Sequence, residues 1–143
     1  MKINPKYLLF SSLALLLVAL VLHVNIFFGL ENIPYSIDLF LTAAMVIVWL
    51  VSSHLLKQLQ KFQPSLTPLQ VLRLNTPVWL PFFVVFTGLY AIFNMGMMIR
   101  TCWAGNNLRG ISGFWIFFFA LGLLISWAKM NQQKSAHTEE NDE

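Results

Sequence analysis

Four long apolar runs, uncharged apart from Asp38 at the mouth of the second, constrain this chain more than any other feature. A helix needs about 20 apolar residues to cross the ~30 Å hydrocarbon core of a bilayer. An open sheet would leave backbone groups without hydrogen-bond partners in lipid, so the spans must be helical. The sequence therefore predicts an all-α integral membrane protein. Its four predicted transmembrane helices cover residues 7–28, 37–56, 78–99 and 111–128.

The composition agrees with lipid as the solvent of this chain. Hydrophobic residues make up 57% and charged residues only 10%, whereas a soluble domain carries roughly 25% charged residues. A soluble protein of 143 residues has too little interior to bury so many apolar side chains. The net charge of +3 is small and scattered, which argues against nucleic acid as a partner. The predicted partners are the lipid bilayer and, within it, a second copy or another membrane protein.

The first apolar run follows a short lysine-containing segment, residues 1–6, and so imitates a signal peptide. It is longer than the ~7–15 residues of a signal-peptide core, and bulky residues occupy its end where a cleavage site would need small ones. We expect it to be retained as the first transmembrane helix.

The positions of lysine and arginine predict the orientation. Seven basic residues flank the spans on one side, and only Arg100 and Arg109 lie on the other, between the third and fourth spans. The positive-inside rule places the side with seven in the cytoplasm. The predicted topology is an up-down bundle of four transmembrane helices with both termini cytoplasmic (N-in/C-in). The seven residues are Lys2, Lys6, Lys57, Lys61, Arg73, Lys129 and Lys134.

Two polar segments accompany the transmembrane domain of residues 7–128. In the cytoplasmic loop 57–77, Thr67, Pro68 and Gln70 have the spacing of an N-cap, a first-turn proline and a capping-box glutamine. They predict a short helix lying in the headgroup layer. The C-terminal segment 129–143 is polar and lacks apolar anchors, which predicts a disordered cytoplasmic tail.

No catalytic, cofactor or metal site is predicted. The single cysteine, Cys102, provides neither an intrachain disulfide nor a cysteine-based metal site. At about 1.5 Å per residue, His23 and His54 are expected roughly 20 Å apart along the membrane normal, too far to ligate one haem. Phosphate-binding loops and a Ser-His-Asp set at one depth are also missing from the sequence. Haem or quinone binding stays the weakest alternative, and a haem would need to be shared between subunits or take its ligand pair from a partner.

A polar layer is expected near the outer face. Polar side chains inside a membrane usually face other helices or a wet cavity. One interpretation is an outward-open vestibule for a small solute. The other, which we favour, is hydrogen bonding among the first, third and fourth spans, with Ser112 at the same level. The residues of this candidate vestibule are His23, Asn25, Asp38, Asn94, Arg100 and Arg109.

The sequence favours a non-catalytic membrane component over a transporter. Proton-coupled transport generally needs an ionisable group near the midplane, and here no carboxylate lies deeper than Asp38. The leading hypothesis is an accessory, assembly or scaffold component; the alternative is a small transport or solute-binding protein that uses the polar layer. The short loops and lysine-containing N-terminus resemble those of bacterial inner-membrane proteins, which predicts the cytoplasmic (inner) membrane of a bacterium.

Overall fold

The chain is helical throughout its described secondary structure. The computed structural model describes residues 4–28, 33–101 and 108–141. All the helices except α3 are long and apolar enough to cross a membrane, which confirms the all-helical class and the four candidate spans. The helices are α1 (Pro5–Phe27), α2 (Tyr35–Phe62), α3 (Pro68–Asn75), α4 (Trp79–Thr101) and α5 (Leu108–Asn141).

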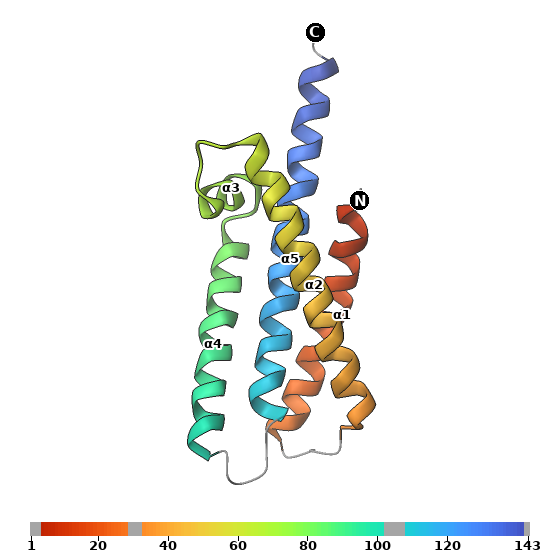
Figure 1. Cartoon of the computed structure of the whole chain (residues 1–143), viewed down its shortest axis with the longest axis vertical. Helices are drawn as coiled ribbons and strands as arrows, with labels where there is room; N and C mark the ends of the chain where they lie inside the picture. The colour runs from red at the N-terminus through yellow and green to blue at the C-terminus, as the bar shows by residue number, and fades with distance from the viewer. Residues whose placement is uncertain (1–3, 29–32, 102–107, 142–143) are drawn as a thin grey trace.

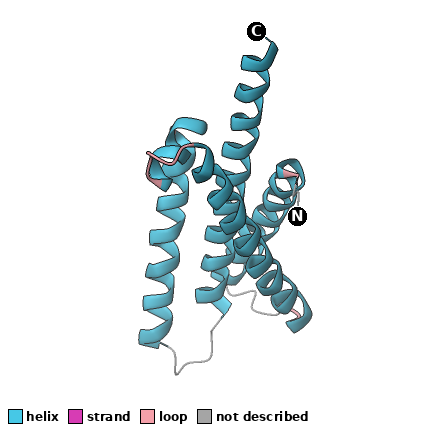
Figure 2. Cartoon of the chain, turned by 45° about the horizontal axis from the view of Figure 1, so that its top comes forward, coloured by secondary structure: helices cyan, strands magenta, loops and turns pink. Residues whose placement is uncertain are grey.

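The long helices lie side by side with α5 among them (Figures 1 and 2). Helix α5 packs against α1, α2 and α4, and its later part also contacts α3. The start of α1, the end of α5 and the α2-to-α4 connection lie at one end of the molecule (Figure 1). We call this the lysine end, after Lys6, Lys61 and Lys129. The opposite end, where α4 finishes near Arg100, is the arginine end.

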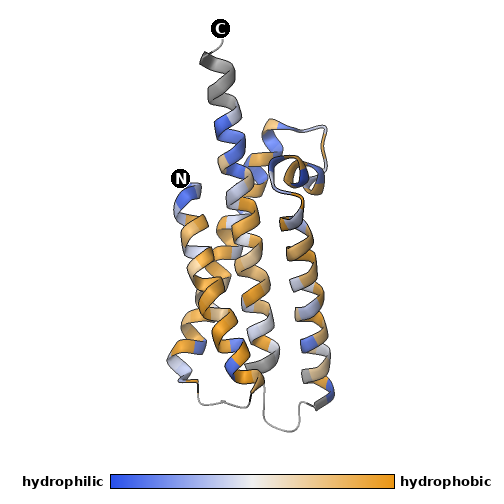
Figure 3. Ribbon diagram, turned by 180° about the vertical axis from the view of Figure 1, so that it is seen from behind, coloured by the Kyte–Doolittle hydropathy of each residue, from blue (hydrophilic) through white to orange (hydrophobic). Residues whose placement is uncertain are grey.

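Burial is concentrated on α5. In the most apolar stretch of α5, 61% is buried inside the protein, whereas the corresponding stretches of α1, α2 and α4 are only 22–28% buried. The rings of Trp115 and Phe119 are fully buried, so the aromatic-rich start of α5 faces the other helices. The outer faces of α1, α2 and α4 instead expose many large apolar side chains. Apolar residues follow the long helices along their length, and polar ones gather at the lysine end (Figure 3).

Glycines on α5 let its neighbours approach closely. A Cβ atom built on Gly122 would lie 2.5 Å from the Oγ of Ser12 on α1 and 2.5 Å from a methyl carbon of Val48 on α2. A Cβ on Gly113 would lie 3.3 Å from the Cα of Ala91 on α4. Small residues at such crossings are a common way to bring membrane helices together.

The cytoplasmic loop predicted at residues 57–77 is partly helical. Helix α2 continues to Phe62, because this stretch has good helix formers and Leu59 is fully buried; Pro64 then prevents continuation. Helix α3 begins with the predicted capping box. The Oγ1 of Thr67 accepts a hydrogen bond from the Gln70 backbone N–H at 3.4 Å, and the Gln70 Oε1 accepts one from the Thr67 N–H at 2.9 Å.

Residues 129–141, predicted from the sequence to belong to a disordered tail, are instead helical in the structure and form the last part of α5. No glycine or proline follows Gly122, and the segment is rich in good helix formers such as Ala, Lys, Gln and Glu. The first turn of this segment also contacts α2 and α3. Lys129 is 6% exposed, and the Nδ2 of Asn131 donates to the backbone oxygen of Asn75 at 3.0 Å. Polar composition predicted disorder because these tertiary contacts are invisible in the sequence.

Candidate functional site

His23 is the centre of the polar layer. It lies near the end of α1, at the arginine end, and only 6% of it is exposed. Its Nδ1 is 2.7 Å from the Oγ of Ser112 on α5, and its Nε2 is 2.5 Å from the phenolic oxygen of Tyr90 on α4. The Tyr90 ring also meets the imidazole edge to face, with centroids 5.4 Å apart. The His23 side chain thus connects three candidate transmembrane helices: α1, α4 and α5.

The two hydroxyl partners suit a neutral imidazole. A neutral histidine has one ring nitrogen that donates and one that accepts, while a hydroxyl group can do either. Whichever tautomer His23 adopts, one hydroxyl donates to the ring and the other accepts from it. Both ring nitrogens are therefore satisfied without a charge, which is favourable inside a membrane.

The two asparagines of the predicted layer have different environments. Asn94, 4% exposed, donates from its Nδ2 to the backbone oxygen of Tyr90 at 3.0 Å. Its Cβ is 3.7 Å from the position of a Cβ built on Gly113, so it packs beside α5. Asn25 is half-buried on α1. Because two residues correspond to about 200° around a helix axis, Asn25 lies on a different face from His23.

Asp38 belongs to a second polar chain, between α2 and α5. The Oγ1 of Thr42 lies 3.5 Å from an Asp38 carboxylate oxygen, at the limit of a hydrogen bond. The same Oγ1 accepts from the indole Nε1 of Trp115 at 3.2 Å. Trp115 is fully buried, so Thr42 provides the partner that its N–H requires.

The arginines of the layer lie at its margin. Arg100 is exposed near the end of α4. Arg109 belongs to the first turn of α5, and its side chain lies outside the described residues.

His54, on α2 toward the lysine end, is exposed, and its Nε2 lies 2.9 Å from the Nε2 of Gln58. His23 and His54 thus belong to separate environments. Among the described residues, no group of three His, Cys, Asp or Glu side chains could hold a metal ion.

Sequence reasoning missed Tyr90 and Thr42. Tyr90 precedes Asn94 by one helical turn and shares its face, and at about 1.5 Å per residue its backbone is some 6 Å further from the arginine end. Its long side chain reaches the level of His23. Thr42 is one turn after Asp38, where the same spacing could have identified it.

Chemically, this arrangement holds helices together. Ser112 and His23 are paired like a nucleophile and its base. However, Ser112 is fully buried, and the second ring nitrogen is already occupied by Tyr90. A substrate has no approach to this serine in the described conformation. The cluster therefore positions α1, α4 and α5 relative to one another.

Comparisons with protein-family models, curated proteins and solved structures give no match to this chain.

Proposed function

We propose that this chain is a multi-pass protein of the cytoplasmic membrane, folded as an up-down bundle of four transmembrane helices with both termini in the cytoplasm. The distribution of charge supports this orientation. Lys6, Lys61 and Lys129 lie at the end that carries both termini, while Arg100 lies at the other. Translocation is disfavoured for segments rich in lysine and arginine.

A phosphatase that is active only in the periplasm tests this orientation. Fused to either terminus, it should give no activity, whereas fusion after Arg100 should give high activity. A cytoplasmic fluorescent reporter at the same positions should give the opposite pattern. Phosphatase activity at either terminus would reject the N-in/C-in topology.

Within the membrane, we propose a non-catalytic role as an accessory, assembly or scaffold component. The observation that carries this proposal is the closed hydrogen bonding of His23, whose two ring nitrogens are engaged by Ser112 and Tyr90. The His23 side chain thus links α1 to α4 and α5. The surface offered to the bilayer is apolar on three of the four long helices, where Phe40, Phe86 and Val21 are among the exposed side chains. Such a surface is suited to lipid and to neighbouring transmembrane helices.

Purification from native membranes in a mild detergent tests this role. We expect the full chain to migrate as a complex, either with a second copy or with another membrane protein, and native mass spectrometry gives the stoichiometry. A strictly monomeric species without a copurifying protein, in several detergents and after crosslinking in the membrane, would contradict the proposal.

The alternative is a small transport or solute-binding protein that uses the outward-facing polar layer. Tyr90 favours it, because this residue is partly exposed and connects directly to the buried His23. Solute binding requires water to reach Asn25 and Asn94 from outside. The accessibility of these positions therefore separates the two functions.

A further inference from the structure

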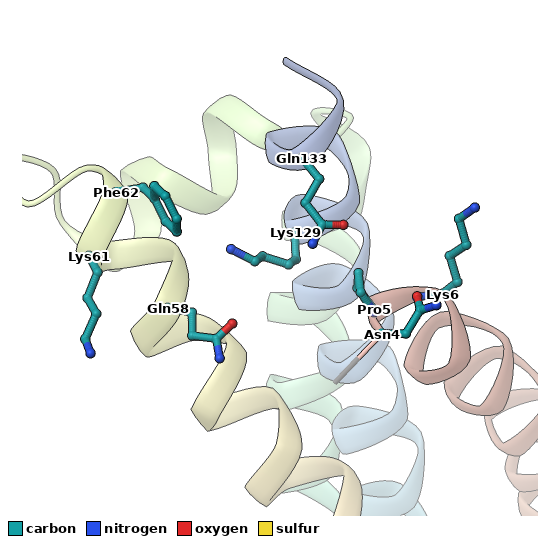
Figure 4. A pocket seen from close by; sticks show the side chains of 8 residues that line it. All are labelled: Asn4, Pro5, Lys6, Gln58, Lys61, Phe62, Lys129 and Gln133. Atoms are coloured by element: carbon teal, nitrogen blue, oxygen red, sulfur yellow. The ribbon is translucent and has the colours of Figure 1, made fainter. Parts of the chain in front are cut away.

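An open pocket of about 710 Å³ lies at the lysine end, between α1, α2 and α5 (Figure 4). Lys6 contributes from α1 and Lys61 from α2, and Lys129 of α5 lies between these helices. Neutral amide groups complete the polar part of the lining: Asn4, Gln58 and Gln133. Lysine residues from three helices thus line one space that also contains hydrogen-bond donors. In Figure 4 the Lys129 side chain points from α5 toward α2, whereas the side chains of Lys6 and Lys61 extend outward from the rim.

Lys129 is the most deeply placed of these lysines, with 6% of its surface exposed. Its Nζ donates to the Oε1 of Gln132 at 2.8 Å and lies 4.6 Å from the centroid of the Phe62 ring. An ammonium group has three donors, and neither a neutral amide nor an aromatic face carries a full counter-charge.

No counterion for Lys129 is present among the described side chains. Asp38 is the sole carboxylate among them, and it lies near the start of α2, at the arginine end. Burial of a charge is costly unless an opposite charge accompanies it. An anion entering the pocket would reduce this cost.

The backbone adds to the positive potential at one wall of the pocket. Helix α1 begins at Pro5 with no acidic residue in its first turn, and a helix N-terminus carries a partial positive charge. Helix α2 ends nearby with the opposite partial charge, but its last turn carries Lys61. The basic side chains therefore outweigh the one unfavourable helix end.

We propose that this pocket binds a phosphate-bearing anion, the headgroup of an anionic glycerophospholipid in the cytoplasmic leaflet being one source and free phosphate the other. Ammonium and amide groups donate to phosphate oxygens. Basic pockets between transmembrane helices on the cytoplasmic side are suited to anionic headgroups. Tyr7 and Phe10 are exposed in the first two turns of α1, the helix that carries Pro5 and Lys6 of the lining, and they offer apolar surface for acyl chains. The lipid source rests on the membrane orientation proposed above, whereas free phosphate does not.

The test is a binding titration of the full-length chain in an uncharged detergent, followed by native mass spectrometry and thermal unfolding. The added probes are phosphatidylglycerol, phosphatidylcholine with the same acyl chains, and inorganic phosphate. Phosphatidylglycerol should bind more tightly than phosphatidylcholine and raise the unfolding temperature. Lys61→Gln and Lys129→Gln should each weaken its binding by roughly fivefold, the effect of one basic residue near a membrane surface.

Lys57→Gln is the matched control. It removes the same charge from the same helix as Lys61→Gln, but Lys57 does not line the pocket. It should leave binding within about twofold of the wild type, well inside the effect of one lining lysine. Lys129→Arg should preserve binding, because arginine keeps the charge and donates well to phosphate. Lys61 is exposed, so Lys61→Gln retains the test if Lys129→Gln folds poorly.

The three probes also identify the source of the anion. Binding of phosphatidylglycerol alone, dependent on the pocket lysines, supports the lipid headgroup. Binding of inorganic phosphate with the same dependence supports free phosphate. Equal binding of the two lipids without binding of phosphate, or equal effects of Lys57→Gln and Lys61→Gln, would overturn the proposal.

Discussion

The Nδ1 of His23 lies 2.7 Å from the Oγ of Ser112, although 89 positions of the chain separate the two residues. This contact joins the end of α1 to the start of α5, while the other ring nitrogen reaches Tyr90 on α4. Few direct contacts exist between α1 and α2, or between α1 and α4, in the described chain, so most of the cohesion passes through α5. Loss of His23 should consequently loosen three helices at once.

Replacement of His23 by alanine should destabilise the fold by about 1–3 kcal/mol. Interhelical hydrogen bonds in membrane proteins contribute about 0.6 kcal/mol each, and the cavity left by the ring adds a further cost. Unfolding in mixed micelles with increasing SDS, followed by circular dichroism, measures the difference.

His54→Ala is the control for this experiment. His54 is exposed and interacts with Gln58 one turn further along its own helix, so its removal should change stability by less than about 0.5 kcal/mol. Equal losses from the two substitutions would show that the His23 contacts do not hold the helices together.

Gly122→Ala should cost about 1–3 kcal/mol through overpacking. The added methyl group would meet side-chain atoms of Ser12 on α1 and Val48 on α2 at once, so relief requires new side-chain rotamers or movement of α5 away from both helices. The same SDS titration measures the loss, and crosslinks between α1 and α5 report the displacement.

Gly96→Ala is the matched control on α4. A Cβ atom built on Gly96 meets nothing within 4 Å, so the substitution should be neutral or slightly stabilising, because alanine favours a helix more than glycine does. If Gly96→Ala proves as destabilising as Gly122→Ala, helix propensity or lipid contact determines the cost, and close packing does not.

The sequence predicted the helical class, the four candidate spans and the α3 capping box, because each depends on local composition and spacing. It did not predict the central place of α5. Glycines occur in both α4 and α5, and only the structure distinguishes Gly122, which is packed against two helices, from Gly96, which faces open space.

The level of the polar residues along the helices could be predicted from the sequence, but the side chains that contact one another could not. Residues such as His23 and Asn94 could be placed at a similar level from helix rise alone. Rotation about each helix axis decides which side chains meet, and this rotation follows from packing. For that reason Tyr90 was missed, and Asn25 lies on a different face from His23.

Thr42 and Trp115 should show energetic coupling. Thr42→Val keeps the shape of the side chain but leaves the buried indole N–H without this acceptor, which should cost about 1–3 kcal/mol. In a Trp115→Phe background, the indole N–H is absent, so the same Thr42→Val change should cost much less. A double-mutant cycle by SDS unfolding gives the coupling energy. An identical cost of Thr42→Val in both backgrounds would mean that the 3.2 Å contact contributes nothing.

Thiol labelling from outside the membrane decides whether the polar layer is open to water. On a Cys102→Ser background, Arg100→Cys should react rapidly with an impermeant maleimide, because Arg100 is exposed at the arginine end. Asn94→Cys should react slowly, because Asn94 is 4% exposed and lies against α5. A rate difference of at least about tenfold would correspond to roughly 1.4 kcal/mol of protection. Rapid labelling at both position 25 and position 94 would instead support a vestibule, and with it the solute-binding alternative, since interhelical packing excludes the reagent from position 94.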